Sequence, residues 1–351
     1  MAQNNGRCGK KGDRLKLAIL TRHYEPLSLR IYRENIVREL IILGIEVLPF
    51  TEDDSIPERC DLVWEPGLAG SHLPHPIFKN IQIPFVATVH GAAPFIMKWF
   101  EVYPDLLHAL LGKIQKRRTL AAWRWFRKKV SAVIAVSEFG AKEISTVFDL
   151  PTNMIYFIHH GVDHDTFDMD GKKPDIEWNY LLHVSQYKPI KNVDRIFAAY
   201  STLPVDGRPV LVAILPDYNN KKVDSKGIRI ISERLSPIEL AKWYRGGIGF
   251  VFPSLRESFG MPILEAMACG CPVITSNISA CPEVAGDAAL LVDPYSVDDI
   301  AGAMKRLIED EPLRQSLRQK GLARSRQFTW HKSAREHLKV FEKIAGEKLW
   351  V

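Results

Sequence analysis

The sequence predicts an α/β fold made of two Rossmann-like domains that face a cleft. Short apolar runs typical of buried parallel strands alternate with segments of helical spacing along most of the chain. The chain has 351 residues and 46% hydrophobic content, which is enough for two globular domains. We expect a first domain over residues 1–172, a second over 173–328, and a C-terminal helix over 329–351 that returns to the first domain.

The first half opens with a βαβ unit. Residues 15–20 predict a strand, 29–43 an amphipathic helix that Gly44 ends, and 46–50 a second strand. Strands are also expected at 60–64, 84–89, 132–136 and 154–158, and Ser137 is a suitable N-cap for a helix over 138–147. His90 directly follows a strand, where parallel sheets bind ligands. A structural hydrogen bond is the alternative role for a lone histidine.

Residues 95–130 combine basic and aromatic side chains. The basic residues are Lys113, Lys116, Arg117, Arg118, Arg124, Arg127, Lys128 and Lys129. One interpretation is that residues 99–129 contact an anionic membrane surface. The alternative, which we favour for residues 120–130, is a long helix that packs on the sheet and exposes a basic face. No motif supports a nucleic-acid partner, and none is expected.

The second half repeats the alternation. Strands are expected at 180–184, 210–215, 228–231, 248–252 and 271–276, and helices at 193–200, 239–244, 297–309, 313–324 and 332–348. Ser236 and Pro237 suit a helix start. Lys188 and Lys191 come just before the helix at 193–200, where positive charge and free N–H groups favour phosphate. Solvated lysines are the alternative.

The stretch 251–284 predicts a strand, a polar loop, a helix and another strand. Gly260 lets the loop backbone approach a ligand, and Pro262 suits the first turn of the helix. Glu257 lies in the loop and Glu265 about one turn into the helix. Two carboxylates would repel phosphate but accept hydrogen bonds from neutral hydroxyls, such as those of a ribose and a hexose. Solvent-exposed charges are the alternative interpretation.

The run ESFGMPILE at 257–265 resembles the E-x7-E signature of retaining GT-B glycosyltransferases of family 4. The resemblance continues to residue 294 and includes HGVD at 160–163 and FTW at 328–330. The sequence departs from the family pattern in three places. It has no paired glycines at 21–28, Gln186 stands where arginine is common, and His160 replaces an asparagine.

The resemblance implies a GT-B fold and a role for each matching residue. Glu265 is expected to bind the ribose of a sugar nucleotide, and the catalytic residues Glu257 and His90 to contact the transferred sugar. Lys191 and Lys188 are expected to bind the diphosphate. The remaining donor contacts are expected from the loop residues Ser258, Phe259, Gly260 and Met261 and, for the base, from the backbone at Arg234 and Leu235.

The implied reaction is hexose transfer with retained anomeric configuration to a glycan or lipid-linked acceptor, in surface polysaccharide or glycolipid synthesis. GDP-mannose is the first expected donor and a UDP-hexose the second; no metal or other cofactor is expected. A GT-B-type sugar-nucleotide epimerase and a non-catalytic sugar-nucleotide-binding protein are the alternatives. The complete glutamate pair and Lys191 favour an active transferase.

The sequence is typical of a protein of the cytoplasm. No apolar run approaches the roughly 18 residues that span a bilayer, and residues 1–14 lack the apolar core of a signal peptide. We expect a cytoplasmic protein that associates with a membrane only peripherally, at its inner face. The net charge of +6 suits an anionic substrate or surface but requires neither. Cys269 and Cys271 are expected to be reduced core thiols.

Overall fold

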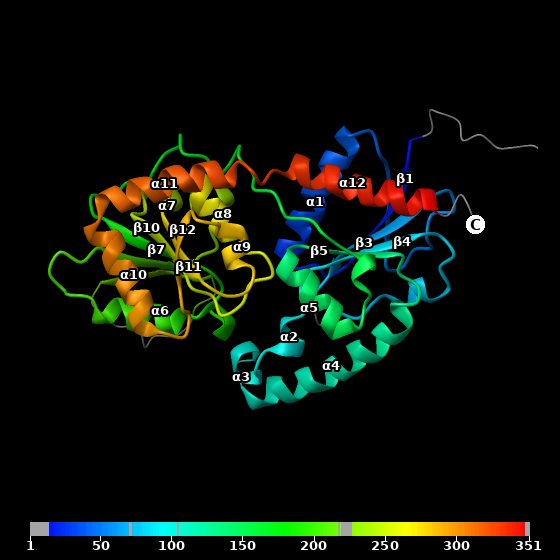
Figure 1. Ribbon diagram of the computed structural model, residues 1–351, viewed down its shortest axis with the longest axis horizontal. Coiled ribbons are helices and arrows are strands. Elements are labelled where there is room, and N and C mark those ends of the chain that lie inside the picture. The colour runs from blue at the N-terminus through cyan, green and yellow to red at the C-terminus, as the bar shows by residue number, and fades with distance from the viewer. Residues whose placement is uncertain (1–13, 70–71, 104, 217, 219–226, 348–351) are drawn as a thin grey trace, which may run out of the picture.

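Two parallel β-sheets, each of six strands among the described residues, form the framework of the computed structural model, which describes residues 14–69, 72–103, 105–216, 218 and 227–347 (Figure 1). The first sheet has the order β2-β1-β3-β4-β5-β6. Its strands are β1 (Lys16–Thr21), β2 (Glu46–Thr51), β3 (Leu62–Leu68), β4 (Phe85–Val89), β5 (Ala132–Ala135) and β6 (Ile155–Phe157). All of its neighbouring strands pair in parallel.

The second sheet has the order β12-β11-β10-β7-β8-β9 and is also parallel throughout. Its strands are β7 (Tyr180–Val184), β8 (Val210–Ile214), β9 (Ile228–Ile231), β10 (Gly249–Phe252), β11 (Val273–Ser276) and β12 (Ala289–Val292). The chain adds β8 and β9 on one side of β7, then returns and continues with β10 on the other side. Strand order therefore reverses between β7 and β10, and the loops that follow these two strands lie together at the carboxyl edge.

Helices cover both faces of each sheet, as the uninterrupted burial of the central strands requires. On the first sheet, Leu17 and Ile19 face α1 and α12, while Ala18 and Leu20 belong to the core on the side of α4 and α5. The helices of this half are α1 (Leu27–Ile42), α2 (Ala93–Ile96), α3 (Trp99–Val102), α4 (Leu106–Phe126), α5 (Glu138–Phe148) and α12 (Trp330–Glu347).

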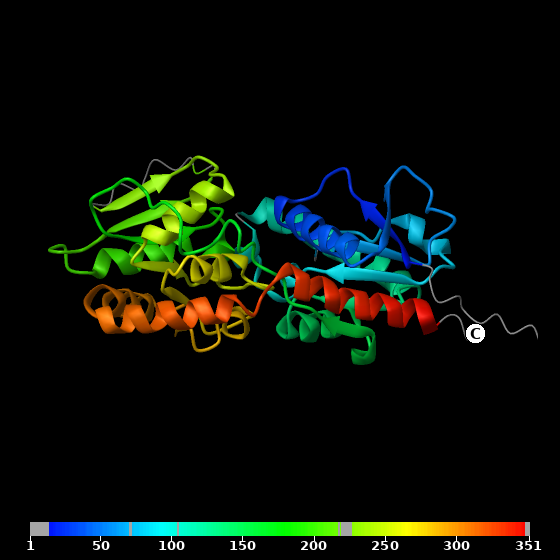
Figure 2. The same ribbon diagram turned by 90° about the horizontal axis from the view of Figure 1, so that it is seen from above.

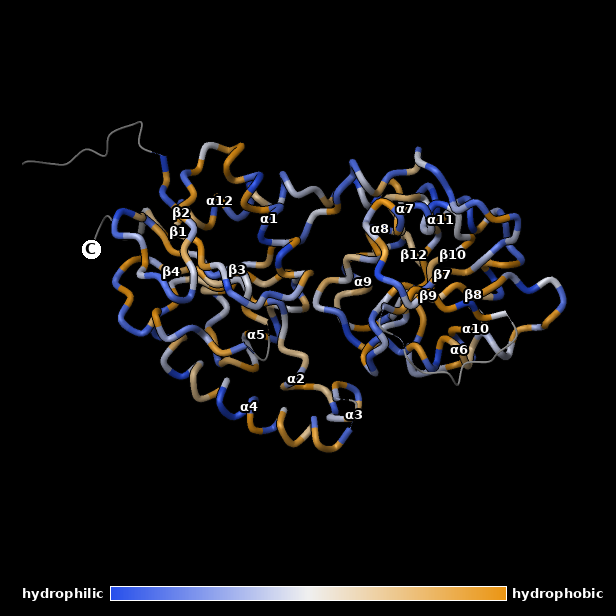
Figure 3. The backbone as a smooth tube through the Cα atoms, turned by 180° about the vertical axis from the view of Figure 1, so that it is seen from behind, coloured by the Kyte–Doolittle hydropathy of each residue, from blue (hydrophilic) through white to orange (hydrophobic). Residues whose placement is uncertain are grey.

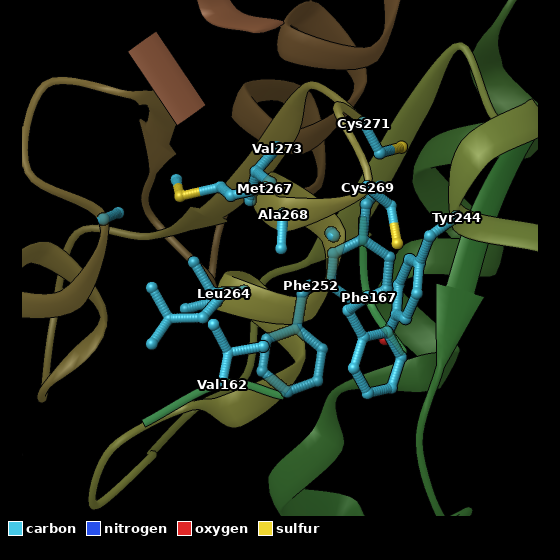
Figure 4. Close-up of a cluster of buried hydrophobic side chains, with 14 of the residues drawn as sticks. Val162, Phe167, Tyr244, Phe252, Leu264, Met267, Ala268, Cys269, Cys271 and Val273 are labelled. Atoms are coloured by element: carbon cyan, nitrogen blue, oxygen red, sulfur yellow. The ribbon is translucent and has the colours of Figure 1, made fainter. Parts of the chain in front are cut away.

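The second sheet has two cores of its own. One includes Phe250, Phe252 and the helices α7 and α8, and Figure 4 shows its side chains around Tyr244 and Phe252. Cys269 and Cys271 are buried in it as free thiols, which confirms the prediction; Cys8 lies outside the described residues. The helices are α6 (Val193–Thr202), α7 (Pro237–Gly246), α8 (Met261–Ala268), α9 (Cys281–Ala285), α10 (Val297–Glu309) and α11 (Glu311–Ser325).

The C-terminal helix α12 returns to the first domain, as predicted (Figure 2). It packs beside α1, where Tyr32 and His337 are both buried. His337 Nδ1 donates to the carbonyl of Ser333 (2.7 Å), so its Nε2 accepts from the hydroxyl of Tyr32 (2.6 Å). This buried hydrogen bond fixes the position of α12 beside α1.

Two local predictions were wrong in detail. The predicted strand at 60–64 begins later and continues to Leu68, although Pro66 and Gly67 are residues that usually end strands. The register of β3 against β4 shifts between Glu65 and Leu68, and this irregularity accommodates Pro66 and Gly67 within the strand. The long helix, considered as the alternative interpretation for residues 95–130 and favoured for 120–130, is divided. This stretch contains α2, α3 and α4, and Asp105 accepts from His108 N (2.9 Å) and starts α4 as a new helix.

No helix within the described ranges is long and apolar enough to cross a membrane.

Candidate functional site

The two loops at the strand-order reversal bring Lys191 and Glu257 into direct contact. Lys191 ends the short 3-10 turn η3 (Pro189–Lys191) after β7, and Glu257 lies in the loop after β10. Lys191 Nζ donates to Glu257 Oε1 at 2.6 Å and lies 5.2 Å from the centre of the Phe252 ring. A backbone bond from Leu255 N to Ile190 O (2.9 Å) joins the same loops. An ion pair therefore lies where open parallel sheets bind ligands.

Gly260 shapes the start of α8 beside this pair. Its φ of +101° is in the left-handed region, where glycine is favoured, and it is the N-cap residue of α8. Met261 and Pro262 follow as the first helical residues. At the other end, Gly270 has a φ of +71° beyond the last turn, as predicted for a helix-ending glycine.

Glu265 lies one turn further along α8, with its carboxylate facing the core of the second domain. The Tyr244 hydroxyl donates to Glu265 Oε2 at 3.2 Å. Burial raises the pKa of Glu265 to about 7, and the hydrogen bond from Tyr244 opposes this shift only in part. Glu265 is half-buried, and the Tyr244 hydroxyl satisfies only part of its acceptor capacity, so the carboxylate can accept further hydrogen bonds from a ligand.

Lys188 adds a second positive charge near Lys191. Burial, followed by repulsion from Lys191, lowers its pKa. It lines a cavity of about 590 Å³ between the two domains, which also has Phe100, Glu101, Arg195 and Tyr295 in its wall. Tyr295 donates its hydroxyl to Glu101 Oε1 (2.9 Å), so α3 of the first domain is hydrogen-bonded to the second domain beside this cavity.

His90 lies at the carboxyl end of β4 and makes the structural hydrogen bond that was the alternative interpretation. Its Nε2 donates to the carbonyl of Pro66 at 2.8 Å, and its ring meets Tyr32 edge-on at 4.7 Å between centroids. Burial lowers its pKa to about 4, so the ring is neutral near pH 7. Because Nε2 carries the proton, Nδ1 has its lone pair available as an acceptor.

A stack of rings connects His90 to the loop that carries Glu257. His90 and His160 stack at 5.6 Å, and His160 meets the buried Phe259 edge-on at 4.8 Å. Asparagine would not form these ring contacts, so the departure at position 160 has a visible structural consequence. From the sequence, His160 was identified only as a departure from the family pattern. Its aromatic ring, which asparagine lacks, was the signal that could have indicated these ring contacts.

Gly91 allows the two domains to touch at the centre of the site. Its φ is +133°, and a Cβ atom placed there would clash with Ser258 Oγ. Ser137 also reaches this loop: its hydroxyl accepts from Gly140 N (2.9 Å) as the predicted N-cap and donates to the carbonyl of Ser258 (2.6 Å). The end of β4, the start of α5 and the Glu257 loop are thus one contact region.

Two further acidic residues join the domains here and were missed from the sequence. Glu143 of α5 forms an ion pair with Arg256, and both side chains are nearly buried. Glu283 of α9 accepts from Glu138 N (2.8 Å) and Phe139 N (3.0 Å) at the start of α5, and His159 Nε2 donates to it at 2.6 Å. For the Glu143–Arg256 pair, the available signal was that Arg256 directly precedes Glu257 in the sequence.

The residues expected at the nucleotide base lie at the end of β9, on the edge of the second sheet. Arg234 is exposed, and Leu235 packs against the core that contains α7 and α8.

In the first domain, Arg22 lies in the loop after β1, where the family usually has paired glycines and this sequence has none. Its Nε donates to the buried Glu65 at 2.9 Å, and it also pairs with Glu52.

These observations agree with the comparisons with known proteins. The model of glycosyl transferases group 1 matches residues 166–324, and that of glycosyltransferase family 4 matches residues 57–166. Together they cover residues 57–324, most of both domains. The chain therefore belongs to the family 4, group 1 glycosyltransferases, and its two parallel sheets have the GT-B arrangement.

Similar proteins include two mannosyltransferases of Escherichia coli. The O-antigen chain mannosyltransferase B is 30% identical over 60% of this chain and 60% of its own length. The serotype-specific mannosyltransferase WbdA is 28% identical over 62% of this chain, which corresponds to only 29% of its own length. The crystal structure of Anabaena HepE with UDP and glucose superposes with a TM-score of 0.71 at 14% identity, over 94% of this chain and all of that one, which shows a shared fold.

Proposed function

We propose that the protein transfers a hexose from a nucleoside diphosphate sugar to a glycan or lipid-linked acceptor, with retained anomeric configuration. The observation that carries the proposal is the meeting of Lys191 and Glu257 at the strand-order reversal, with Glu265 one turn into the adjacent helix. A cation for a diphosphate and two carboxylates for neutral hydroxyls then lie along one edge of the second sheet.

Each group has a role that follows from its surroundings. Glu265, which keeps acceptor capacity beyond its bond from Tyr244, accepts hydrogen bonds from the ribose hydroxyls. Lys191 and Lys188 bind the diphosphate and stabilise the negative charge that develops as it leaves. We propose that these cations carry that charge in place of a metal ion. The backbone at Arg234 and Leu235 contacts the base.

The transferred sugar is held by the loop and by the first domain. Once the diphosphate attracts Lys191, the freed Glu257 carboxylate accepts from the sugar hydroxyls, together with amides of the loop residues Ser258, Phe259, Gly260 and Met261. The Nδ1 lone pair of His90 accepts from another hydroxyl. We assign no protein nucleophile, so these groups orient the sugar and stabilise the transition state.

GDP-mannose is the proposed donor, and a UDP-hexose is the second candidate. The similar proteins named as mannosyltransferases support the first, and the fold shared with a protein crystallised with UDP and glucose supports the second. Surface polysaccharide or glycolipid synthesis is the proposed process, because one similar protein is named for the O-antigen chain. The proposed location is the cytoplasm, with peripheral association at the inner face of the membrane.

The test is a thermal-shift panel of GDP-mannose, UDP-glucose and ADP-glucose, followed by product analysis with the donor that binds. We expect the largest stabilisation with GDP-mannose, slow hydrolysis without acceptor, and an α-linked product by NMR when a mannose-containing oligosaccharide is added. Glu257→Gln should lower turnover at least tenfold with little change in nucleotide affinity. Interconversion of sugar nucleotides would support an epimerase instead. Tight binding without turnover would support a non-catalytic binding protein.

A further inference from the structure

The cavity of about 590 Å³ between the two domains borders the proposed donor site but is not part of it. We call it the interdomain cavity. Pro189 and Leu255 line it from the loops after β7 and β10, whereas Lys191, Glu257 and α8 are not among the described residues of its wall. Its other side is α3, and Figure 3 shows α3 at the end of α4 that points toward the second domain. The cavity is therefore a separate space in which a second ligand can lie beside the donor.

Three cationic side chains line the interdomain cavity. Lys98, Lys188 and Arg195 form no ion pair with a carboxylate in the part of the chain that the structure describes. Lys98 Nζ lies 5.7 Å from the centre of the Phe100 ring, and Arg195 Cζ lies 5.4 Å from that of Tyr295. Burial and the charge of a neighbouring lysine lower the pKa of Lys188, and no acidic group offsets them. Neutral rings do not cancel these charges, so the cavity has unneutralised cations.

The two carboxylates in the same wall are already bonded to other groups of the protein. Glu101 is buried and accepts from the Tyr295 hydroxyl (2.9 Å) and from the backbone N–H of Lys98 (3.1 Å). Asp194 accepts from the Tyr187 hydroxyl at 2.7 Å. The ammonium and guanidinium groups thus remain as the donors that a ligand can use. Charge-assisted hydrogen bonds from such donors favour a phosphate group.

Three aromatic rings complete the wall and indicate what else the ligand contains. Phe100, Tyr187 and Tyr295 have exposed fractions of 52%, 40% and 49%. The two tyrosine hydroxyls are bonded to carboxylates, which leaves the ring faces to contact a ligand. A sugar ring has C–H groups that pack on such faces. The volume lies in the range of roughly 300–1,000 Å³ that is typical of small-molecule sites, and is much larger than a phosphate ion needs.

We infer that the interdomain cavity binds a phosphorylated saccharide, with its phosphate held by Lys98, Lys188 and Arg195 and its sugar against the three rings, and that this saccharide is the acceptor. The acceptor role rests on the proposed function, whereas binding in the cavity does not. Lys98 belongs to the first domain and Arg195 to the second, so the ligand connects the domains beside the Tyr295–Glu101 hydrogen bond. Lys188 borders both ligands and reduces the repulsion between their phosphates.

The test is calorimetric titration with mannose 6-phosphate, mannose and inorganic phosphate, without GDP and at saturating GDP. Mannose 6-phosphate should bind in both conditions, and more tightly than mannose or phosphate alone, because its two parts have separate contacts. The cavity variant Lys98→Gln/Arg195→Gln should bind it at least tenfold more weakly and keep its affinity for GDP. Phe100→Ser should weaken binding of mannose 6-phosphate but not of inorganic phosphate. Thermal unfolding of each variant checks that the fold is kept.

The matched control is Lys79→Gln/Arg229→Gln, which removes the same two charges elsewhere. Lys79 and Arg229 also lie over aromatic rings, 5.7 Å from the centre of Trp125 and 4.8 Å from that of Trp178, but neither lines the cavity. The control should bind mannose 6-phosphate as the wild type does. No binding of mannose 6-phosphate, equal affinity for mannose, or equal loss in the control would overturn the inference. So would displacement of mannose 6-phosphate by GDP, since that result would place it in the donor site.

The acceptor role is measured with GDP-mannose as donor. A phosphorylated mannose oligosaccharide should have a KM at least tenfold below that of the same oligosaccharide after phosphatase treatment. The cavity variant should lose this difference and keep kcat. Equal KM values for the two acceptors, with transfer intact, would contradict the acceptor role alone. Absence of donor binding and transfer would contradict the proposed function, and the titration without GDP would still decide whether the cavity binds a phosphorylated saccharide.

Discussion

Glu265 places a carboxylate in a largely apolar part of the second domain, and this lowers the stability of the fold when no ligand is bound. Its pKa is raised to about 7 from 4.5, chiefly by burial. A group with a raised carboxyl pKa destabilises the fold at pH values above that pKa, where it must ionise without adequate solvation. The cost disappears below pH 4.5, where the carboxyl group is protonated in both the folded and unfolded states.

Glu265→Gln should therefore stabilise the free protein and weaken nucleotide binding. We expect a gain on the order of 2 kcal/mol at pH 8, which fades between pH 7 and pH 4.5. Affinity for the nucleoside diphosphate should fall about tenfold, since hydrogen bonds from the ribose to a charged acceptor are lost. Urea unfolding and calorimetric titration at pH 8 and pH 5 measure both effects. Unchanged nucleotide affinity would contradict the ribose role.

At the scale of elements, the start of α5 is completed by a residue from the other domain. Glu283 of α9 accepts two backbone N–H groups of α5, where the helix dipole favours negative charge. Burial alone would raise the pKa of Glu283, but its bonds to His159 and to these N–H groups outweigh burial and lower it. A lowered carboxyl pKa stabilises the fold at pH values above the ordinary value, and this stabilisation is lost as pH falls through the folded pKa.

Glu283→Gln should lower the free energy of unfolding by about 1–2 kcal/mol at pH 7, because a neutral amide interacts more weakly with the helix start. The difference from wild type should shrink as pH falls below about 4. Urea unfolding followed by circular dichroism at both pH values measures it. The exposed Glu58 provides the control, Glu58→Gln, which should leave stability unchanged. An equal deficit for Glu283→Gln at pH 7 and at pH 3 would argue against an electrostatic origin.

At the scale of the whole molecule, a nearly buried ion pair connects the two domains beside the site. Arg256, next to Glu257, pairs with Glu143 of α5, and only 12% and 6% of these side chains are exposed. The guanidinium also lies 5.1 Å from the centre of the Phe139 ring. Removing one member of such a pair leaves the other charge buried without a partner.

Arg256→Met should destabilise the protein by about 3 kcal/mol, and the added change Glu143→Leu should restore most of that loss. A double-mutant cycle from urea unfolding measures the coupling between the two residues. Recovery in the double variant is the expected sign of a paired charge. If Arg256→Met/Glu143→Leu is as unstable as the sum of the single variants, the two charges do not act as a pair.

Local patterns determined much of this protein. The strands Tyr180–Val184 and Ile228–Ile231 and the helix Val297–Glu309 have the predicted bounds, and Ser137 and Gly270 have the predicted places at helix ends. Hydrophobic periodicity and capping act between near neighbours, so they are legible in a single sequence. The order of predicted strands and helices also placed Lys191 and Glu257 at the carboxyl edge of one sheet.

Only the tertiary structure decided which residues meet across the domains. The approach of Gly91 to Ser258, the Arg256–Glu143 pair and the hold of Glu283 on α5 join segments more than 100 residues apart. The exposure of large apolar side chains on the first half of α4 was equally undetermined, because the same amphipathic pattern suits a packed helix. Local propensity carries no information on such contacts. They depend on how the two domains are positioned relative to each other, and the segments that cross between the domains determine this.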